Sequence, residues 1–360
     1  MEIVFNNIYS GKRVLVTGHT GFKGSWLTCW LQRLGARVCG IGLSPETDPN
    51  HWDLLDLDCP DIRQDIRDPD RTRAAITESS PEIVFHLAAQ ALVRRSYRKP
   101  IDTWSTNVGG LVNVLDACRQ IGSLRAIVVV TTDKVYENRE WAWGYRETDR
   151  LGGHDPYSAS KACSELVAAS YRRSFFSGTQ YPLLATARAG NVIGGGDWSE
   201  DRLIPDLIRA AVRGDVVEIR SPHATRPWQH VLDCLSGYLM VGQRLLEQDR
   251  DCATEWNFGP ERSGNRQVID VLHAVKSRLS ECAWNVTDRP QPHEARLLCL
   301  DTAKAKDQLQ WEPIWSLDEG INATADWYRR YLRESRVITE EQIVQYQKAA
   351  TERKTVWASG

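Results

Sequence analysis

Tyr157 and Lys161 are the residues of this sequence whose types and spacing point most directly to chemistry. If the segment is helical, a spacing of four residues places the phenol and the ammonium on one face. The lysine can then lower the pKa of the tyrosine, so that the phenol exchanges a proton near neutral pH. An ordinary surface pair on a helix is the alternative, and the neighbouring motifs decide between the two interpretations.

A second group of reactive side chains, Thr131-Thr132-Asp133-Lys134, follows directly after the apolar run 127–130. A buried strand that ends there would bring a hydroxyl, a carboxylate and an ammonium to the carboxyl edge of a sheet, where ligands bind in α/β folds. The alternative is that Asp133 and Lys134 only begin a solvated loop. Because five such groups would converge at this edge, we interpret them as an acid/base site: Thr132, Asp133, Lys134, Tyr157 and Lys161.

A glycine-rich loop follows the apolar run 14–16 and precedes a helical pattern. Glycines at such a junction let the backbone approach a pyrophosphate, and the helix N-terminus supplies partial positive charge. Glycines also occur in ordinary turns, but the flanking strand and helix favour dinucleotide binding. The residues that we assign to this loop are Gly18, His19, Thr20, Gly21, Phe22, Lys23 and Gly24. We expect the bulky His19 ring, placed near the pyrophosphate, to weaken cofactor binding.

Other segments bear on which dinucleotide binds. The acidic residue expected about 20 residues after the loop, which would bind the adenosine ribose of NAD, is absent from 41–44, and no arginine follows that would bind a 2′-phosphate. The residues alone therefore leave NAD and NADP open. Asp65 and Ile66 either contact the adenine edge or belong to a turn. The small residues in Leu87-Ala88-Ala89-Gln90 would let a strand end approach the cofactor phosphates.

Short β-branched runs alternate with helical patterns, and they predict the elements that position these residues. The expected buried parallel strands are 13–17, 37–41, 83–87, 126–132 and 183–187, with a further strand near 255–258. The expected helices are 25–34, 71–79, 106–121, 158–176, 203–213 and 231–246. This alternation predicts an α/β fold with a Rossmann-like, doubly wound parallel sheet.

The strand and helix pattern weakens after Asn191, where the chain becomes rich in glycine. We therefore expect a smaller, discontinuous α/β domain that binds the substrate. The predicted cofactor-binding domain comprises 1–190 and about 228–258, and the substrate-binding domain comprises 191–227 and about 259–336. The charged tail at 337–360 could form a helix packed on the second domain.

The composition excludes several classes of function. The 360 residues are 42% hydrophobic, enough for a large core, and the formal net charge of −2 gives no reason to expect binding to nucleic acid or an anionic membrane. The nine cysteines include no Cys-x-x-Cys pair, so we expect reduced thiols and no metal site. The first residues lack a signal-peptide pattern, and no segment reaches the roughly 18 apolar residues of a membrane helix. We therefore expect a cytoplasmic protein with a small-molecule partner.

Taken together, the motifs resemble those of the extended short-chain dehydrogenase/reductases and, within them, the sugar-nucleotide 4,6-dehydratases, over roughly residues 10–335. The motifs that carry the resemblance are Gly18-x-x-Gly21-x-x-Gly24, Asp65-Ile66-Arg67, His86-Leu87-Ala88-Ala89-Gln90, Thr106-Asn107-Val108-x-Gly110, Thr131-Thr132-Asp133, Tyr157-x-x-x-Lys161, Arg188-x-Gly190-Asn191-Val192 and Arg226-Pro227-Trp228-x-His230-Val231-x-Asp233. Most family members that act on dTDP- or GDP-sugars have Asp-Glu where this chain has Asp133-Lys134. This difference, together with the sequences of 18–24 and 190–198, resembles the members that act on CDP-glucose.

The resemblance implies a lyase that dehydrates CDP-glucose to CDP-4-dehydro-6-deoxyglucose and recycles bound NAD in each turnover, as a step in deoxysugar and lipopolysaccharide O-antigen biosynthesis. Tyr157, assisted by Lys161 and Thr132, would take the O4 proton while C4 gives a hydride to NAD. After a base removes the C5 proton, Asp133 would protonate the departing C6 hydroxyl, and the hydride would return to C6.

The resemblance also implies two sets of binding residues. Beside the glycine loop, the cofactor would contact Asp65, Ile66, Leu87, Ala88, Ala89, Asn107, Thr131, Tyr157 and Lys161. The nucleotide sugar would contact Gln90, Arg188, Asn191, Arg202, Arg226 and Arg296. Arginine suits a diphosphate because its planar guanidinium group donates two parallel hydrogen bonds.

Two roles are open for Lys134. A lysine acts as a base only when it is neutral, and a free lysine titrates at about 10.4. Removal of the C5 proton by Lys134 therefore requires a lowered pKa. Otherwise Lys134 stays charged and stabilises the C5 enolate while another group takes the proton.

Two other functions also remain open. A nucleotide-sugar epimerase or decarboxylase of the same family would use Tyr157 and Lys161 but would not need Asp133 as an acid. A non-catalytic dinucleotide sensor would have no use for Tyr157, Lys161 and Thr132 together. The resemblance implies, in addition, a homodimer or higher homo-oligomer assembled through the helices at about 104–121 and 158–176.

Overall fold

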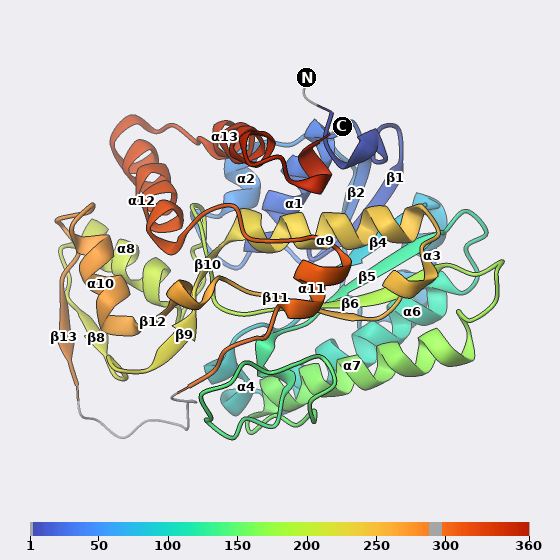
Figure 1. Cartoon of the computed structure of the whole chain (residues 1–360), viewed down its shortest axis with the longest axis horizontal. Coiled ribbons are helices and arrows are strands. Elements are labelled where there is room, and N and C mark those ends of the chain that lie inside the picture. The colour runs from blue at the N-terminus through green and yellow to red at the C-terminus, as the bar shows by residue number, and fades with distance from the viewer. Residues whose placement is uncertain (1–2, 288–296, 360) are drawn as a thin grey trace.

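The computed structural model describes residues 3–287 and 297–359, and a parallel sheet forms its centre (Figure 1). Within the described residues this sheet has seven strands in the order β11-β6-β5-β4-β1-β2-β3, and every neighbouring pair is parallel. The strands are β1 (Arg13–Thr17), β2 (Arg37–Gly42), β3 (Asp61–Arg63), β4 (Ile83–His86), β5 (Ala126–Val130), β6 (Leu183–Ala189) and β11 (Glu255–Phe258). The predicted Rossmann-like sheet is confirmed, including the late strand at its edge.

Helices cover both faces of the sheet because successive strand residues point to opposite sides. Val14 and Val16 pack into one core with α1 (Phe22–Arg33) and α9 (Val231–Leu246). Leu15 packs into a second core, which is formed with the other group of helices. These are α3 (Pro69–Ser79), α6 (Leu111–Cys118) and α7 (Pro156–Ser174). The sheet is therefore doubly wound.

The helix expected over 106–121 is divided into two parts. Its first part, Ser105–Gly110, is π-helical, and regular α-helix begins only at Leu111. A Cβ on Gly110 would lie 2.5 Å from Ile66 Cδ1, so the glycine allows this wide turn to approach the chain after β3. The prediction of one continuous helix is wrong, because periodicity does not reveal a widened turn.

A smaller α/β region lies beside the carboxyl edge of the sheet (Figure 1). Its helices are α8 (Leu203–Arg213), α10 (Val268–Lys276) and α12 (Leu317–Glu334). Its short strand pairs are β7 (Val192–Ile193) with β10 (Gln229–His230), β9 (Thr225–Pro227) with β12 (Asn265–Gln267), and β8 (Val217–Ile219) with β13 (Trp284–Val286). The exact domain boundaries remain a prediction.

The C-terminal tail folds as α13 (Thr339–Glu352) and packs against α1. Its Tyr346 hydroxyl donates to Asp233 Oδ1 of α9 at 2.8 Å, and Gln342 Nε2 donates to the Ala323 carbonyl of α12 at 2.7 Å. The expected helix is present, and Gln342 joins it to α12 of the chain's second half. Its buried aromatic face also contacts α1 and α9, so it connects the sheet to α12.

The described residues also form the short α-helices α2 (His51–Leu55), α4 (Val93–Arg98), α5 (Pro100–Trp104) and α11 (Ala303–Gln308). Among the helices of the described residues, we find none with the length and apolar character needed to cross a bilayer.

Candidate active site

A cavity of about 1100 Å³ lies where β5 and β6 end, between the sheet and α8. Its wall includes most of the residues that the sequence grouped as an acid/base site, namely Thr132, Asp133, Lys134 and Tyr157. A volume of this size accommodates a nucleotide sugar. The predicted convergence of these side chains is therefore present in the structure.

Two glycines give the loop after β1 its shape. Gly18 has a φ of +74°, and a Cβ there would lie 2.7 Å from the Ala88 backbone nitrogen. A Cβ on Gly24 would lie 2.1 Å from the Gly18 carbonyl oxygen. These contacts bring the loop, the start of α1 and the end of β4 close together, as dinucleotide binding at a helix N-terminus requires. The residues present thus fit the cofactor that the sequence implies.

Hydrogen bonds fix the loop and the end of β4 beside it. Thr20 Oγ1 donates to the Leu43 carbonyl at 2.8 Å. The Leu87 amide donates to the Thr17 carbonyl at 3.0 Å, and the Ala88 amide donates to the Thr17 hydroxyl at 3.3 Å. Phe22 begins α1. Leu87, Ala88 and Ala89 thus lie beside the glycine loop at the carboxyl end of β4, as predicted.

The His19 ring does not lie where the sequence predicted it, near the pyrophosphate. Its ring is fully buried, Nε2 lies 2.8 Å from Asp61 Oδ1, and a Cβ on Gly40 would lie 2.3 Å from His19 Cγ. The ring therefore packs against β2 and β3, and burial lowers its pKa. The expectation of a bulky ring facing the pyrophosphate is wrong, because Gly40 provides a place for the ring inside the fold.

Lys23 lies on the cavity wall, although it belongs to the cofactor loop. Its Nζ is 3.5 Å from the Tyr238 hydroxyl of α9, and burial lowers the pKa of the ammonium. After burial, its positive charge also contributes to the lowered pKa of Lys161, and it partly offsets the rise that burial causes in the pKa of Asp133. Sequence reasoning missed this position beside the acid/base groups.

Asp65 and Ile66 make local contacts in the structure. Asp65 Oδ2 accepts from Arg67 at 2.6 Å, and this hydrogen bond lowers the pKa of the carboxyl. Ile66 is buried, and its carbonyl accepts from Asn113 Nδ2 at 2.9 Å. These contacts fit the turn that the sequence offered as the alternative, and a role at the adenine edge remains a prediction.

Asn107 and Gln90 join the chain after β4 to α7. Asn107 Nδ2 donates to the Gln90 carbonyl at 3.0 Å and to Ser160 Oγ at 2.9 Å. The Gln90 side chain donates to Thr103 Oγ1 at 2.9 Å and does not line the cavity. The structure thus does not bring Gln90 to the place expected of a substrate contact, because its amide closes its own loop.

Helix α7 positions the tyrosine and the lysine. Pro156 occupies the first turn and Asp155 caps the helix by accepting from the Ser158 amide at 2.9 Å, so the helix starts just before Tyr157. Lys161 is buried, and its Nζ donates to the Val130 carbonyl at 3.1 Å. Burial, followed by the charge of Lys23, lowers the pKa of Lys161 to about 8.

The protonation of Tyr157 differs from the expectation. Burial raises its pKa to about 12, while a hydrogen bond with Thr132 and the charge of Arg202 act in the opposite direction. The predicted lowering by Lys161 is wrong for this arrangement, because desolvation dominates and the lysine ammonium is directed to the Val130 carbonyl.

Asp133 is a buried carboxyl group with one unpaired oxygen. Oδ1 accepts from the Thr132 hydroxyl at 3.0 Å, whereas Oδ2 has no hydrogen-bond partner among the described residues. Burial raises the pKa of Asp133, against the lowering effects of Lys134, Thr132, Arg226 and Lys23. A buried, partly unsatisfied carboxyl with a raised pKa on a cavity wall is suited to act as an acid toward a ligand. Lys134 follows it on the same wall.

The expected substrate residues divide into three groups. Asn191, Arg202 and Arg226 line the cavity, as predicted, and Arg202 Nη1 lies 3.1 Å from Asp197 Oδ2. Arg188 does not line the cavity, because its guanidinium group is buried against Glu165 at 2.9 Å. Arg296 lies outside the described residues.

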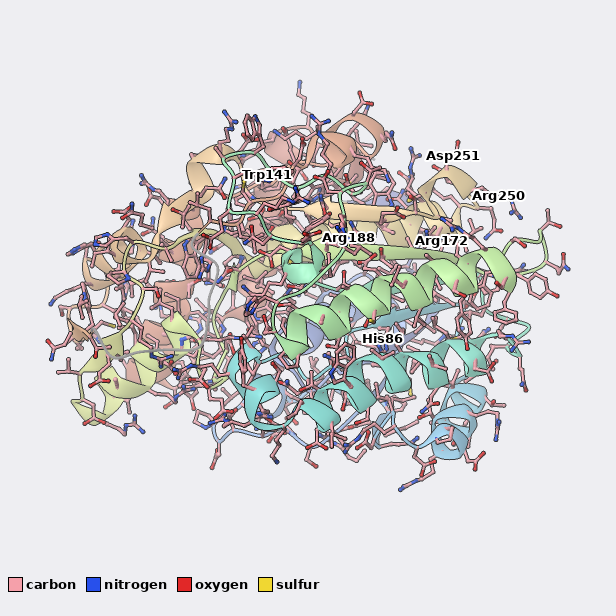
Figure 2. The ribbon with its side chains drawn as sticks, turned by 90° about the horizontal axis from the view of Figure 1, so that it is seen from below. His86, Trp141, Arg172, Arg188, Arg250 and Asp251 are labelled. Atoms are coloured by element: carbon pink, nitrogen blue, oxygen red, sulfur yellow. The ribbon has the colours of Figure 1, made fainter. Side chains whose placement is uncertain are left out.

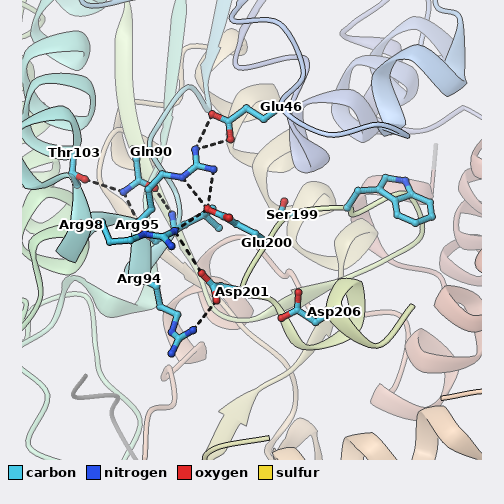
Figure 3. A network of polar contacts seen from close by, with 12 residues as sticks. Glu46, Gln90, Arg94, Arg95, Arg98, Thr103, Ser199, Glu200, Asp201 and Asp206 are labelled. Carbon is cyan, nitrogen blue, oxygen red and sulfur yellow. Dashed lines mark hydrogen bonds and ion pairs between the residues drawn. The ribbon is translucent and has the colours of Figure 1, made fainter. Parts of the chain in front are cut away.

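An ion-pair network connects α4 to the loop before α8 (Figure 3). Arg94 lies 2.9 Å from Asp201, and both line the cavity. Arg95 pairs with Glu200 at 3.0 Å and with Glu46 at 2.6 Å. This network could not be predicted from the sequence, because the partners are far apart in the chain and no spacing rule relates them.

Comparison with known proteins identifies relatives among the sugar-nucleotide dehydratases. The protein-family model described as GDP-mannose 4,6 dehydratase matches residues 15–324. A CDP-glucose 4,6-dehydratase from Salmonella typhimurium is 45% identical over 360 residues, which cover 97% of this chain and 100% of the relative.

Solved structures show the same fold. An epimerase from Methanothermobacter thermautotrophicus superposes with a TM-score of 0.80 at 25% identity, over 92% of this chain and 96% of its own. The NAD complex of a UDP-glucose 4-epimerase from Thermus thermophilus superposes with a TM-score of 0.76 at 26% identity, over 88% and 98% of the two chains. This chain therefore belongs to the GDP-mannose 4,6 dehydratase family, within the extended short-chain dehydrogenase/reductases.

Proposed function

We propose that this chain dehydrates CDP-glucose to CDP-4-dehydro-6-deoxyglucose with bound NAD. The observation that carries the proposal is the Asp133 carboxyl, which is buried, has a raised pKa and keeps one oxygen without a partner among the described residues. Loss of water from C6 needs such an acid, whereas epimerisation at C4 does not. The Salmonella typhimurium relative, a CDP-glucose 4,6-dehydratase, supports the choice of sugar and nucleotide.

The cofactor loop fits NAD, and the Thermus thermophilus relative was solved with NAD bound. When bound, NAD supplies a nicotinamide ring that accepts a hydride from C4 of the sugar and returns it to C6. This chain's part is to hold the pyrophosphate at the start of α1, through the glycine loop 18–24 and the strand end at 87–89.

Tyr157, as the phenolate, takes the proton from the O4 hydroxyl. The Thr132 hydrogen bond and the Arg202 charge oppose the effect of burial on its pKa, and both favour the phenolate. Lys161 anchors α7 to the end of β5 through Val130, which keeps the phenol at the cavity wall. Loss of this proton, together with the C4 hydride that bound NAD would accept, leaves a ketone at C4, and the ketone makes the C5 proton acidic.

Lys134 and Asp133 carry out the elimination. Lys134 removes the C5 proton, and Asp133 gives its proton to the C6 hydroxyl, which leaves as water. As the hydride returns to C6, Lys134 would give its proton back to C5. Tyr157 releases the O4 proton to solvent, and Asp133 regains a proton from solvent through the cavity that these residues line. For the diphosphate we propose Arg202 and Arg226, whose guanidinium groups lie on the same wall.

The test is a single incubation. Purified protein with added NAD is mixed with CDP-glucose, and the nucleotide sugar is analysed by mass spectrometry, with UDP-glucose and dTDP-glucose as matched controls. We expect loss of one water from CDP-glucose and little change in the other two. An isomer of unchanged mass would instead identify an epimerase, and no reaction with any sugar would support a dinucleotide sensor.

Two further properties belong to the proposal. We propose a homodimer through α7 and the helical segment at about 104–121, where Leu166 and Trp104 expose apolar surface, and light scattering of the purified protein tests it. We also propose that the enzyme works in the cytoplasm, where its product feeds deoxysugar and lipopolysaccharide O-antigen biosynthesis. The nine free thiols suit a reducing compartment.

A further inference from the structure

Glu165 is a buried acid that contacts the end of β5 and the neighbouring strand β6, and the proposed reaction does not use it. It lies on α7, one helical turn after Lys161, and is 3% exposed. Its Oε1 accepts from the Thr131 hydroxyl. Its Oε2 accepts from Thr186 Oγ1 at 2.7 Å and from Arg188 Nη2 at 2.9 Å. One carboxylate therefore joins α7 to the ends of two neighbouring strands.

Arg188 fixes this carboxylate from the far side. It is 2% exposed and comes from β6, which packs against α7; Figure 2 labels it. Its Nη1 donates to the Tyr136 hydroxyl at 2.7 Å and to the Glu147 carbonyl at 3.0 Å. Tyr136 in turn donates to Asn257 Oδ1 at 2.8 Å. These bonds leave Glu165 little freedom to change its rotamer, because charged hydrogen bonds in a buried site are strong.

On its other oxygen, Oε1, Glu165 binds Thr131, the residue that directly precedes Thr132 and Asp133. Lys161 Nζ donates to the carbonyl of Val130, and Glu165 accepts from the hydroxyl of Thr131. Helix α7 thus binds two consecutive residues at the end of β5. The next two residues are Thr132 and Asp133, whose 3.0 Å hydrogen bond orients the proposed acid.

We propose that Glu165 is a positioning residue, which acts through Thr131 to hold the Thr132–Asp133 pair in register with Tyr157. The inference rests on the proposed dehydration, since it assigns Glu165 a part in the geometry of that reaction. Proton transfer requires hydrogen-bond distance, and a displacement of about 1 Å can reduce a rate by about a hundredfold. A fixed end of β5 therefore matters more for kcat than for substrate binding.

A purely structural ion pair is the alternative. In that case Glu165 and Arg188 would only neutralise each other inside the fold, and loss of any one hydrogen bond to the carboxylate would lower stability alone. Substitution of Glu165 itself does not separate the two cases, because it would leave the Arg188 charge buried without its partner. The threonines that bind the carboxylate do separate them.

The experiment compares three variants at saturating NAD and CDP-glucose. Thr131→Val removes the bond to Oε1, Thr131→Ser keeps a hydroxyl there, and Thr186→Val removes the bond to Oε2. The last is the matched control, because Thr186 is also buried, bonds the same carboxylate and leaves Arg188 on that oxygen. The readouts are kcat, KM, the melting temperature and the hydrogen exchange of the amides of 132–135.

We expect Thr131→Val to lower kcat at least about tenfold, with KM within about twofold, and Thr131→Ser to restore most of the loss. Thr186→Val should melt as early as Thr131→Val but keep kcat within about twofold. Amide exchange at 132–135 should rise in Thr131→Val only. Equal kcat losses in the two valine variants, or a wild-type kcat in Thr131→Val, would overturn the inference.

Failure of the proposed function gives a different result. A wild-type protein that does not dehydrate CDP-glucose would refute the substrate assignment. The amide exchange at 132–135 still decides the positioning role, since it needs no substrate. Exchange that is the same in Thr131→Val and Thr186→Val would then reject it.

Discussion

Thr132 donates its hydroxyl to Asp133 Oδ1 at 3.0 Å, while a Cβ on Gly190 would lie 3.0 Å from the other oxygen, Oδ2. The glycine thus makes room for the carboxyl, and Thr132 sets its orientation. Burial raises the pKa of Asp133, so the carboxyl keeps its proton to a higher pH than a free aspartate does. These contacts underlie the first prediction.

Asp133→Asn should stop the reaction after oxidation at C4. The amide keeps the shape of the side chain but has no acidic proton to give to the C6 hydroxyl. In a single turnover, mass spectrometry should find a nucleotide sugar that has lost two hydrogens but no water. Loss of water at the wild-type rate would remove Asp133 from the role of acid.

Tyr157→Phe should abolish turnover and leave CDP-glucose binding nearly intact. Only the acceptor of the O4 proton is lost, and the aromatic ring still fills its place beside the cavity. Calorimetry measures binding and mass spectrometry measures turnover. Retention of more than about a tenth of the wild-type kcat would exclude the tyrosine from this step.

The sheet and the cavity wall were predictable from the sequence, because a continuous apolar run such as Val14, Leu15 and Val16, typical of a strand buried on both faces, is a local property. In a parallel sheet the end of β5 and the start of α7 lie at the same edge. Asp133 and Tyr157 could therefore be placed together from their motifs alone.

The partner of a charged side chain is not a local property. Arg188 was expected at the substrate, yet it binds Glu165, 23 residues away in the chain. One signal was available: Glu165 follows Lys161 by four residues and so shares its helical face. For His19 no signal existed, since the space beside Gly40 forms only when β1 and β2 pair.

Asp233 should make stability depend on pH. Burial raises its pKa to about 6 in the folded chain, against about 3.9 when unfolded. The folded state therefore binds this proton more tightly, and the resulting stability, on the order of 3 kcal/mol, is full below about pH 4 and is lost as the pH rises through 6.

Melting temperatures of the wild type and of Asp233→Asn, measured from pH 5 to pH 8, test this sign. Asparagine does not titrate and can still accept from Ile314 N and the Tyr346 hydroxyl. The wild type should lose stability relative to the variant as the pH rises. A difference that is constant over this range would contradict the prediction.

Trp357→Ala should destabilise the fold without changing the chemistry. Trp357 is 2% exposed and stacks on Phe5, with ring centroids 4.8 Å apart, so it joins the two ends of the chain. Truncation of a buried tryptophan costs about 3–5 kcal/mol. Differential scanning fluorimetry should find a lower melting temperature, and Trp143→Ala, at a site that is 70% exposed, should leave it unchanged. Equal melting of the two variants would mean that the C-terminal contact adds no stability.

Two substitutions of Lys134 separate the two roles that the sequence left open, removal of the C5 proton and stabilisation of the enolate by charge. Lys134→Met removes both charge and basicity, whereas Lys134→Arg keeps the charge but cannot become neutral. If the lysine is the base, both variants should reduce exchange of the C5 proton with deuterium from solvent by at least about a hundredfold. If Lys134→Arg exchanges at nearly the wild-type rate, the side chain stabilises the enolate by its charge, and another group removes the proton. Because Lys134 lies on the cavity wall directly after Asp133, we expect the first result.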